Sequence, residues 1–255
     1  MQRAKFIIHT EEEIARIRVA ARITALARDQ IADAVRVGMS TKELDMIAGT
    51  IIRDLGAEPA FLNYCGYPAN ICISRNDVVV HGIASEKEII REGDIVSVDV
   101  GARINGAVGD TAKTVFAGGG EPPADVKRLL EGTEKALEAG ISAALNGHCM
   151  HDLSAAVEKV GVSHHLGIVR EYVGHGCGIR LHEPPDVPNF TSFGRGVKLL
   201  PGMVLCIEPM FNLGSHKIYV ESDDWTVRTA DGKWSAHFEH MVLIGEDRTE
   251  VLTSV

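Results

Sequence analysis

The sequence predicts a fold of the α/β (α+β) class, with an antiparallel sheet core, flanking helices and two related halves. Three observations predict it. The 255 residues are 45% hydrophobic but only 5% aromatic, which suits aliphatic helices packed on a sheet. Two helical segments precede any strand-like run. The same order of segments then returns in the second half of the chain.

The first half opens with two helices. Thr10 and Glu13 form a capping box, and apolar residues at helical spacing carry that helix from Ile14 to about Val35. A second capping box, at residues 40–43, opens another helix that ends at a glycine. We therefore expect two consecutive helices before the sheet begins.

Short β-branched runs follow these helices, at residues 71–73, 78–80, 95–98 and 107–116. The dipeptide Asn105-Gly106 is typical of a two-residue hairpin loop between the last two runs. The runs are therefore predicted to be antiparallel strands.

The second half repeats this plan. Helices are expected at about 125–145 and 151–160, and strands at about 204–207 and 238–244. An offset of 109 residues aligns the two halves at the following pairs: Gly38 with Gly147, Leu44 with Leu153, Gly93 with Gly202, and Asp99 with Glu208. We interpret this as a duplication, with chance similarity of helix and strand patterns as the alternative.

No linker separates the halves, since the glycines at 118–120 and the prolines at 122–123 span only a short turn. We expect one catalytic domain over residues 1–255, with pseudo-repeat halves at about 10–120 and 121–255.

Composition excludes several classes of function. The net charge is -9 and no dense run of Lys or Arg occurs, so nucleic acid is not expected as a substrate. Neither a signal-peptide core near the N-terminus nor a membrane-spanning stretch is present in the sequence. Five cysteines without a C-x-x-C pair imply neither a disulfide framework nor a structural zinc site. We expect a cytoplasmic protein.

Two aspartates are predicted to lie side by side. If Asn105-Gly106 is the hairpin loop, Asp99 faces Ala112, and Asp110 is its diagonal neighbour on the same face. Two carboxylates so close repel each other unless a cation lies between them or one is protonated. The alternative is a pair of solvated aspartates near a turn.

The second half adds three more candidate ligands. His175 lies between glycines, and Glu208 and Glu239 adjoin apolar runs that should be buried. Burying carboxylates without partners is costly, and Lys113 and Lys217 are the only obvious basic neighbours. Four carboxylates and one imidazole suit two divalent ions that jointly activate a water. The sequence lacks H-E-x-x-H, which disfavours a single-zinc protease.

With these residues in place, the chain resembles the type I methionine aminopeptidases from about Thr10 to Leu252. The segments that carry the resemblance are Tyr64-Cys65-Gly66-Tyr67-Pro68, Asn70-Ile71-Cys72-Ile73-Ser74, Val80-His81-Gly82-Ile83, Ser97-Val98-Asp99-Val100-Gly101, Gly109-Asp110-Thr111, Gly174-His175-Gly176, Ile207-Glu208-Pro209-Met210 and Phe238-Glu239-His240. The resemblance implies the pseudo-symmetric pita-bread fold and removal of an N-terminal methionine by hydrolysis at a dinuclear metal centre.

The resemblance also implies roles for the five ligands. Asp110 and Glu239 would bridge two divalent ions, which would be Mn, Fe, Co or Zn. Asp99 would bind one ion, and His175 with Glu208 would hold the other. Glu208 would also handle the proton of the water between the ions.

Further residues would bind the substrate by the same resemblance. His182 would hydrogen-bond the scissile carbonyl or its oxyanion, and His81 would contact the scissile amide. The methionine pocket would be lined by Phe61, Tyr64, Tyr67, Cys72, His81, Leu181, His182 and Trp225. Leu181 departs from the bacterial pattern, in which Phe is common. A side site for sodium or potassium would involve Asn76, Val78 and Ser235.

Two rival interpretations share this fold. An aminopeptidase P or prolidase would prefer a proline after the cut, but its glutamate strand usually continues Glu-Pro-Gly, where this chain has Glu208-Pro209-Met210. A non-catalytic binding protein would have lost ligands that this chain keeps. The expected partners are peptides and nascent polypeptides with N-terminal methionine, and the ribosome that carries them. A monomer in the short bacterial style is expected, with no membrane partner.

Overall fold

The computed structural model describes residues 6–255. The first five residues, part of the N-terminal stretch in which the sequence predicts no signal peptide, lie outside the described residues. Elements of the first half are α1 (Glu11–Ala34), α2 (Thr41–Asp54), β1 (Glu58–Pro59), the 3-10 turn η1 (Tyr64–Gly66), β2 (Cys72–Arg75), β3 (Val78–Val80), β4 (Ile95–Ile104) and β5 (Ala107–Phe116).

The second half has two helices and ten strands within the described chain. They are α3 (Ala124–Ala143), α4 (Met150–Ser163), β6 (Gly167–Ile168), β7 (Gly174–Gly176), β8 (Glu183–Val187), β9 (Val204–Ile207), β10 (Met210–Asn212), β11 (Ile218–Val220), β12 (Val227–Thr229), β13 (Ser235–His237), β14 (His240–Ile244) and β15 (Thr249–Val251). Within residues 6–255, none of the helices combines the length and apolar character needed to span a bilayer.

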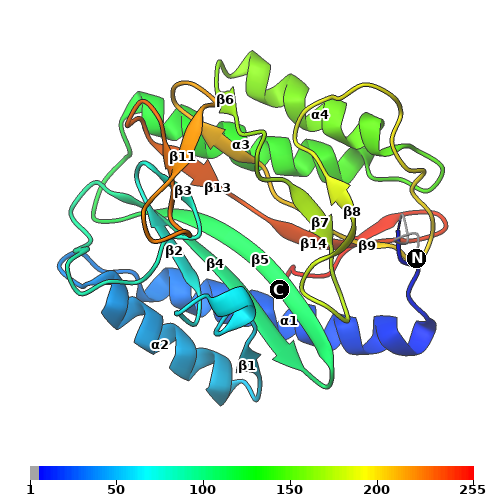
Figure 1. The fold of residues 1–255 in the computed structure, drawn as a ribbon, viewed down its shortest axis with the longest axis horizontal. Coiled ribbons are helices and arrows are strands. Elements are labelled where there is room, and N and C mark those ends of the chain that lie inside the picture. The colour runs from blue at the N-terminus through cyan, green and yellow to red at the C-terminus, as the bar shows by residue number, and fades with distance from the viewer. Residues whose placement is uncertain (1–5) are drawn as a thin grey trace.

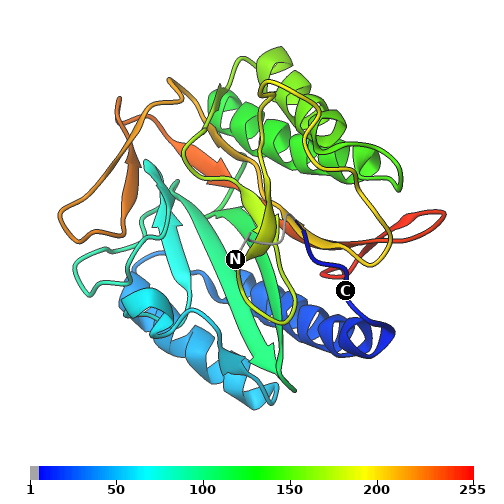
Figure 2. The ribbon, with the colours of Figure 1, turned by 45° about the vertical axis from the view of Figure 1, so that its right-hand side comes forward.

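The strands form the middle layer of the molecule, with α1 and α2 on one side and α3 and α4 on the other (Figure 1). Backbone pairing divides them among four sheets, ordered β1-β4-β2 with β5 also on β4, β13-β10-β6, β11-β12-β3, and β15-β14-β9-β7-β8. Paired strands run antiparallel throughout these sheets. The view turned by 45° shows the same three layers (Figure 2). The predicted class and helix flanking are confirmed.

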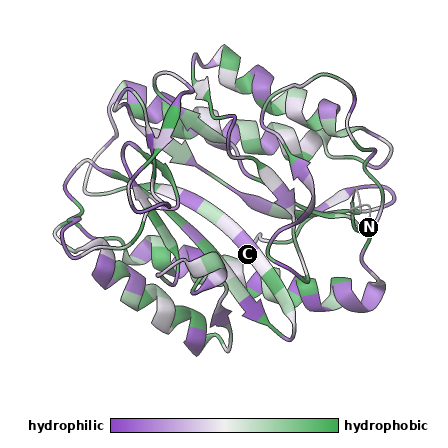
Figure 3. Cartoon of the chain, in the orientation of Figure 1, coloured by the Kyte–Doolittle hydropathy of each residue, from purple (hydrophilic) through white to green (hydrophobic). Residues whose placement is uncertain are grey.

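Both predicted capping boxes are present. Thr10 caps α1 and Ser40 caps α2, each accepting the backbone N–H of a glutamate three residues later. Apolar and polar residues alternate along the helices, as the hydropathy colouring shows (Figure 3). This spacing turns one face of each helix toward the strands.

The offset of 109 residues recurs in the structure. Helix α2 begins at Thr41 and α4 at Met150, and both have 14 residues. Isolated bridges join Ser40 to Ile89 in one half and Cys149 to Lys198 in the other. The same offset therefore relates backbone contacts as well as helix starts.

Several strand boundaries differ from the prediction: β2 covers 72–75 instead of 71–73, and β4 extends to residue 104 instead of 98. The strand expected at 238–244 begins at His240, and Phe238 and Glu239 lie in the short connection after β13. The backbone N–H of Glu239 bonds instead to the carbonyl of Ala112 on β5 (2.9 Å). A contact between the two halves thus replaces the expected ladder bond.

Helix α1 packs closely on β5 because Gly109 has no side chain. A Cβ at this position would lie 2.7 Å from the carbonyl oxygen of Ala20 and from the Cα of Ala21, both in α1. The buried face of α1 there is formed by small residues, including Ala20 and Ala21. Gly109 therefore sets the distance between the helix and the strand that carries Asp110.

We predict that Gly109→Ala lowers the free energy of unfolding by roughly 1–3 kcal/mol, because the added methyl must push α1 away from β5. Urea unfolding followed by circular dichroism measures the change. Gly119→Ala is the matched control, since a Cβ there meets nothing within 4 Å. Equal stability of the two variants would show that this contact does not limit packing.

Candidate active site

The five predicted ligands come from five different places in the fold. Asp99 lies on β4, Asp110 on β5 and His175 on β7, while Glu208 follows β9 directly and Glu239 directly precedes β14. No single segment could supply this set, so the site depends on how the sheets pack.

The β4–β5 hairpin has the predicted register. Asp99 pairs with Ala112 and Asp110 with Gly101, which puts the two carboxylates on one face as diagonal neighbours. The loop is Asn105-Gly106, and both residues have positive φ, as a type I′ turn requires. The sequence-based geometry of this pair is confirmed.

The second half brings its three ligands to the same place. His240 on β14 pairs with Ile207 on β9, so Glu239 and Glu208 are the next residues at the same end of the two paired strands. The ring Nε2 of His175 lies 3.4 Å from Glu208 Oε1 and 3.8 Å from Asp110 Oδ2. One imidazole therefore touches a carboxylate from each half.

A buried thiol also belongs to this cluster. Donor atoms of Asp110, His175, Cys206 and Glu239 all lie within 4.8 Å of one another. The backbone pairing of Gly176 with Leu205 puts Cys206 across from His175. Cys206 was not predicted to belong to the cluster, because β9 is buried along its whole length and its pairing with β7 leaves no local signature.

The carboxylates of the cluster are held in an environment that disfavours their charges. Burial raises the pKa of Asp99 to about 7. Burial, followed by the charges of neighbouring carboxylates, raises the pKa values of Asp110, Glu208 and Glu239 well above the ordinary range. Without a bound cation, part of this cluster would hold protons at neutral pH.

Three buried oxygens of the cluster have no hydrogen-bond partner. They are Asp99 Oδ1, Asp110 Oδ1 and Glu239 Oε1. Buried polar atoms are rarely left unpaired, and carboxylate oxygens are preferred ligands of hard and borderline divalent ions. The residues present therefore fit a divalent metal centre.

His175 is prepared for the same task. Its Nδ1 lies 2.9 Å from the carbonyl oxygen of Gly176, so Nδ1 carries the proton and Nε2 is left with a free lone pair. Burial, and then the neighbouring ring of His182, lowers the pKa of His175 to about 3. The imidazole is thus neutral at physiological pH, which is the form that binds metals.

A cavity of about 160 Å³ opens onto this cluster, and every residue predicted for the methionine pocket lines it. Its lining comprises Phe61, Tyr64, Tyr67, Cys72, Val80, His81, Asp99, Asp110, Tyr172, Val173, His175, Leu181, His182, Glu208, Met210, Trp225, His237 and Glu239. The apolar residues and the carboxylates thus border one space.

The ring of Phe61 packs directly on Gly101 of β4. A Cβ atom added at Gly101 would lie 2.8 Å from Cδ1 of Phe61. Tyr67 is fixed by a hydrogen bond from its hydroxyl to the carbonyl of Gly82 (2.8 Å). The edge of Trp225 meets Tyr67 with ring centroids 5.1 Å apart, and Leu181 is buried. These side chains form a narrow apolar slot beside the carboxylates.

Two histidines border the slot without belonging to the carboxylate cluster. The Nδ1 atom of His182 lies 2.9 Å from the hydroxyl of Tyr64, and its ring centroid is 4.1 Å from that of His175. His81 has a left-handed backbone (φ 59°) and packs edge-on against Tyr172 and Trp225. Burial lowers the pKa values of both rings, that of His81 to about 4.

Sequence reasoning missed several residues of the lining, above all His237. This side chain is buried, its Nε2 has no hydrogen-bond partner, and that atom lies 3.7 Å from Glu208 Oε2. His237 precedes Glu239 by two residues, so alternation along the strand could have flagged it. Tyr172 gave no comparable signal, because it lies outside any periodic segment.

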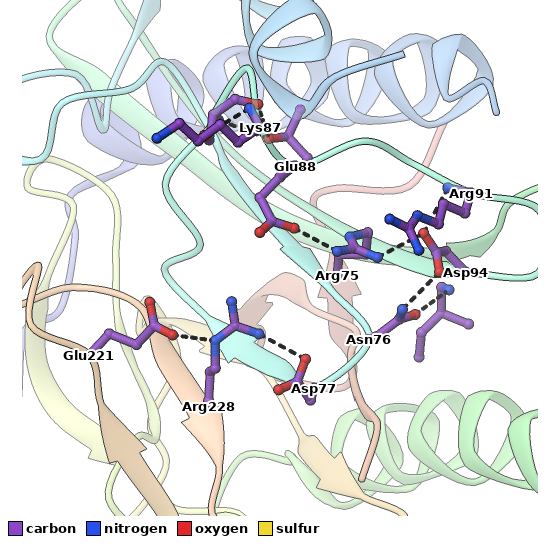
Figure 4. A network of polar contacts seen from close by, with 12 residues as sticks. Arg75, Asn76, Asp77, Lys87, Glu88, Arg91, Asp94, Glu221 and Arg228 are labelled. Atoms are coloured by element: carbon purple, nitrogen blue, oxygen red, sulfur yellow. Dashed lines mark hydrogen bonds and ion pairs between the residues drawn. The ribbon is translucent and has the colours of Figure 1, made fainter. Parts of the chain in front are cut away.

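A network of polar contacts surrounds the turn between β2 and β3 (Figure 4). Arg75, the last residue of β2, contacts Glu88 (2.6 Å) and Asp94 (3.1 Å). Arg228 on β12 contacts Asp77 (2.8 Å) at the β2–β3 turn, and Glu221 as well. The network therefore ties the strands leading to His81 to the hairpin that carries Trp225.

The residues predicted for a monovalent cation lie next to this network. Asn76 has a left-handed backbone (φ 54°), and its carbonyl accepts the backbone N–H of Ser235 (2.8 Å). Val78 begins β3 two residues later. The structure thus brings Asn76 and Ser235 together, and the bound ion stays a prediction.

Comparison with known proteins identifies the family. The model of metallopeptidase family M24 matches residues 15–246. The chain is 43% identical to methionine aminopeptidase 1 of Bacillus subtilis, over 98% of this chain and 99% of that protein. It is also 43% identical to methionine aminopeptidase 1 of Mycobacterium tuberculosis, over 94% and 92% of the two chains.

Solved structures agree with these sequences. Methionine aminopeptidase from Thermotoga maritima superposes with a TM-score of 0.94 at 38% identity, covering 98% of this chain and all of that one. Prolidase from Pyrococcus furiosus reaches 0.79 at 25% identity, and 66% of its length is covered. The chain therefore belongs to metallopeptidase family M24, and within it to the methionine aminopeptidases. The predicted pita-bread fold is confirmed.

The raised pKa of Asp99 predicts how the metal-free protein responds to pH. Between about pH 4 and 7 Asp99 keeps its proton in the folded state but has released it in the unfolded chain. The free energy of unfolding therefore falls as the pH rises through this range. For Asp99 alone the loss is on the order of 4 kcal/mol across that window. Urea unfolding of chelator-treated protein at pH 4.5 and 7.5 measures it.

Asp99→Asn is the control for this experiment, because the amide cannot titrate. The pH dependence should be smaller in the variant than in the unaltered protein. If the two proteins change in parallel, burial does not shift the titration of Asp99.

Proposed function

We propose that this protein removes the N-terminal methionine from peptides and nascent polypeptides, as a hydrolase with a dinuclear metal centre. One observation carries the proposal: the five side chains predicted to bind metal border the same cavity as the apolar slot. Such a slot accepts one side chain and places the following bond beside the ligands. Membership among the methionine aminopeptidases supports the same activity.

The proposed metal ligands are those the sequence predicted. Asp110 and Glu239 would bridge two ions, Asp99 would bind one, and His175 with Glu208 would hold the other. When bound, the ions polarise the scissile carbonyl and make a water acidic enough to act as nucleophile at neutral pH. Carboxylates with one imidazole accept Mn, Fe, Co or Zn.

The chain's own residues move the protons and orient the bond. Glu208 borders both the cluster and the slot, so its carboxylate is placed to accept a proton from the attacking water and to return it. The proton taken from the attacking water would pass from Glu208 to the departing amine. His81 would contact the scissile amide from the opposite wall.

His182 is proposed to stabilise the oxyanion. Because its Nδ1 is engaged by the hydroxyl of Tyr64, the remaining Nε2 is the atom available to donate to the carbonyl oxygen. The lowered pKa keeps this ring neutral in the absence of substrate. A fixed neutral donor does not repel the ions that the cluster is proposed to hold.

Specificity is proposed to come from the slot. Phe61, Tyr64, Tyr67, Cys72, Leu181 and Trp225 all border it. Methionine is unbranched and polarizable, so it fits a narrow aromatic and aliphatic space better than a branched side chain does. Leu181 in place of a phenylalanine alters the wall without touching the carboxylates.

The wider setting is also a proposal. Residues 1–255 would act as one catalytic domain and as a monomer, because one chain supplies all residues of the pocket. Five free cysteines suit the reducing cytoplasm. Nascent chains would be met at the ribosome. A sodium or potassium ion at Asn76, Val78 and Ser235 would brace the wall near β3.

Removal of metal should abolish peptidase activity, and Mn, Co or Fe should restore it, because the carboxylate cluster supplies no nucleophile of its own. Release of methionine from Met-Ala-Ser, identified by mass, measures this under defined metals. Leu-Ala-Ser and an X-Pro peptide are the matched substrates. Indifference to chelation would reject the metal mechanism, and faster cleavage of X-Pro would favour the prolidase alternative.

His182→Ala should lower kcat about 100-fold or more while metal content stays unchanged, because the oxyanion donor is lost but no ligand is. Steady-state kinetics together with elemental analysis of the purified variant test this. His165→Ala, in a turn after α4 and outside the pocket lining, serves as the control. Loss of bound metal in His182→Ala would show that this histidine is a ligand instead.

A further inference from the structure

The segment before α1 reaches the loop that carries Leu181 and His182. We propose that His9 is a positioning residue: through Glu183 it holds residues 177–183, here called the histidine loop, and so fixes where His182 stands in the pocket. The effect on catalysis rests on the proposed function. The contact itself does not.

His9 is anchored where it can act on this loop. Its backbone N–H donates to the carbonyl of Gly202 (2.9 Å), and its side chain is almost fully buried. The ring lies against Gly178, where an added Cβ would be 3.0 Å from two ring atoms. Its Nε2 is 3.1 Å from Glu183 Oε2, a close polar contact that lies off the axis of an in-line hydrogen bond.

Glu183 passes this contact on to the loop backbone. Its other oxygen, Oε1, accepts the N–H groups of Ile179 (3.2 Å) and Arg180 (2.8 Å). The N–H of Gly178 in turn donates to the carbonyl of Arg180 (3.1 Å). One oxygen of Glu183 therefore binds the backbone of the histidine loop, and His9 is the side chain that contacts the other oxygen.

The charge of this carboxylate needs its partners. Burial raises the pKa of Glu183, but the contact with His9 and the bond from Arg180 N–H outweigh it and leave the pKa below its usual value. The Arg180 side chain is mostly exposed and lies 4.0 Å from Glu183 Oε1, so it does not replace His9. Without His9, the buried Oε2 of Glu183 would lose the one close side-chain contact that it makes among the described residues.

Loop position matters because His182 is held from two directions. Tyr64 engages its Nδ1 on the pocket side, while Glu183, the next residue in the chain, fixes the backbone on the other side. Release of the second anchor lets the ring shift relative to the reacting bond. A displacement of about 1 Å in a catalytic group can cost on the order of 100-fold in rate.

The test compares three variants of the full-length protein. His9→Ala removes the contact, and His9→Lys places a different N–H donor beside Glu183. Thr10→Ala is the control, because it removes the cap of α1 at the next residue without touching the loop. Each is measured for kcat and KM on Met-Ala-Ser, for metal content, for melting temperature, and for amide exchange at Ile179 and Arg180 in metal-free protein.

The expected result for His9→Ala is a fall in kcat of roughly 10-fold or more with little change in KM or metal content. Faster exchange at the Ile179 and Arg180 amides should accompany it, and His9→Lys should recover most of both losses. Thr10→Ala should lower the melting temperature and leave kcat within about 2-fold.

Unchanged exchange at Ile179 and Arg180 in His9→Ala would overturn the proposal, as would a kcat that falls no further than in Thr10→Ala. If His9→Ala does not fold, His9→Lys decides: exchange at Ile179 and Arg180 and kcat that change together, or that both stay as in the unaltered protein, support the proposal, whereas faster exchange with an unchanged kcat would overturn it. Absence of any peptidase activity in the unaltered protein would refute the proposed function, while the exchange data would still test the contact.

Discussion

Burying four carboxylates in one cluster costs free energy that the neighbouring side chains cannot offset. Asp99, Asp110 and Glu239 each keep a buried oxygen without a hydrogen-bond partner. Lys113, one of the two basic residues expected nearby, contacts Asp29 on α1 instead. The cluster must therefore hold protons or bind cations from outside, and this choice connects its stability to its proposed chemistry.

The geometry of the cluster is fixed by contacts between the two halves. Glu239 donates its backbone N–H to Ala112, and its carbonyl accepts the hydroxyl of Thr111 (2.7 Å). The residue that pairs with Asp99 and the residue after Asp110 are therefore both joined to Glu239. Thr114 makes equivalent bonds with the backbone of His237. These bonds form within the protein itself, so the carboxylates are positioned without a bound ion. A metal ion would therefore enter a site whose geometry is already set.

Short sequence patterns predicted the first helices and the hairpin of this arrangement. Contacts between segments that are distant in the sequence could not be predicted in this way. Capping boxes located the starts of α1 and α2, and the hairpin dipeptide predicted the register that brings Asp99 and Asp110 together. The roles of the site residues stay predictions that rest on family resemblance. Cys206 beside His175 was missed, because strand pairing across the sheet leaves no local signature. The contact of His9 with Glu183 spans most of the chain and could not be read from spacing.

The central claim is that side chains from both halves share a pair of divalent ions. A crystal structure of the protein soaked in manganese, with anomalous data recorded at the manganese edge, tests this most directly. The account predicts two strong peaks, close together, each contacted by carboxylates of the cluster and one of them also by His175. A single peak, or peaks bound elsewhere while Asp110 and Glu239 remain free, would contradict it.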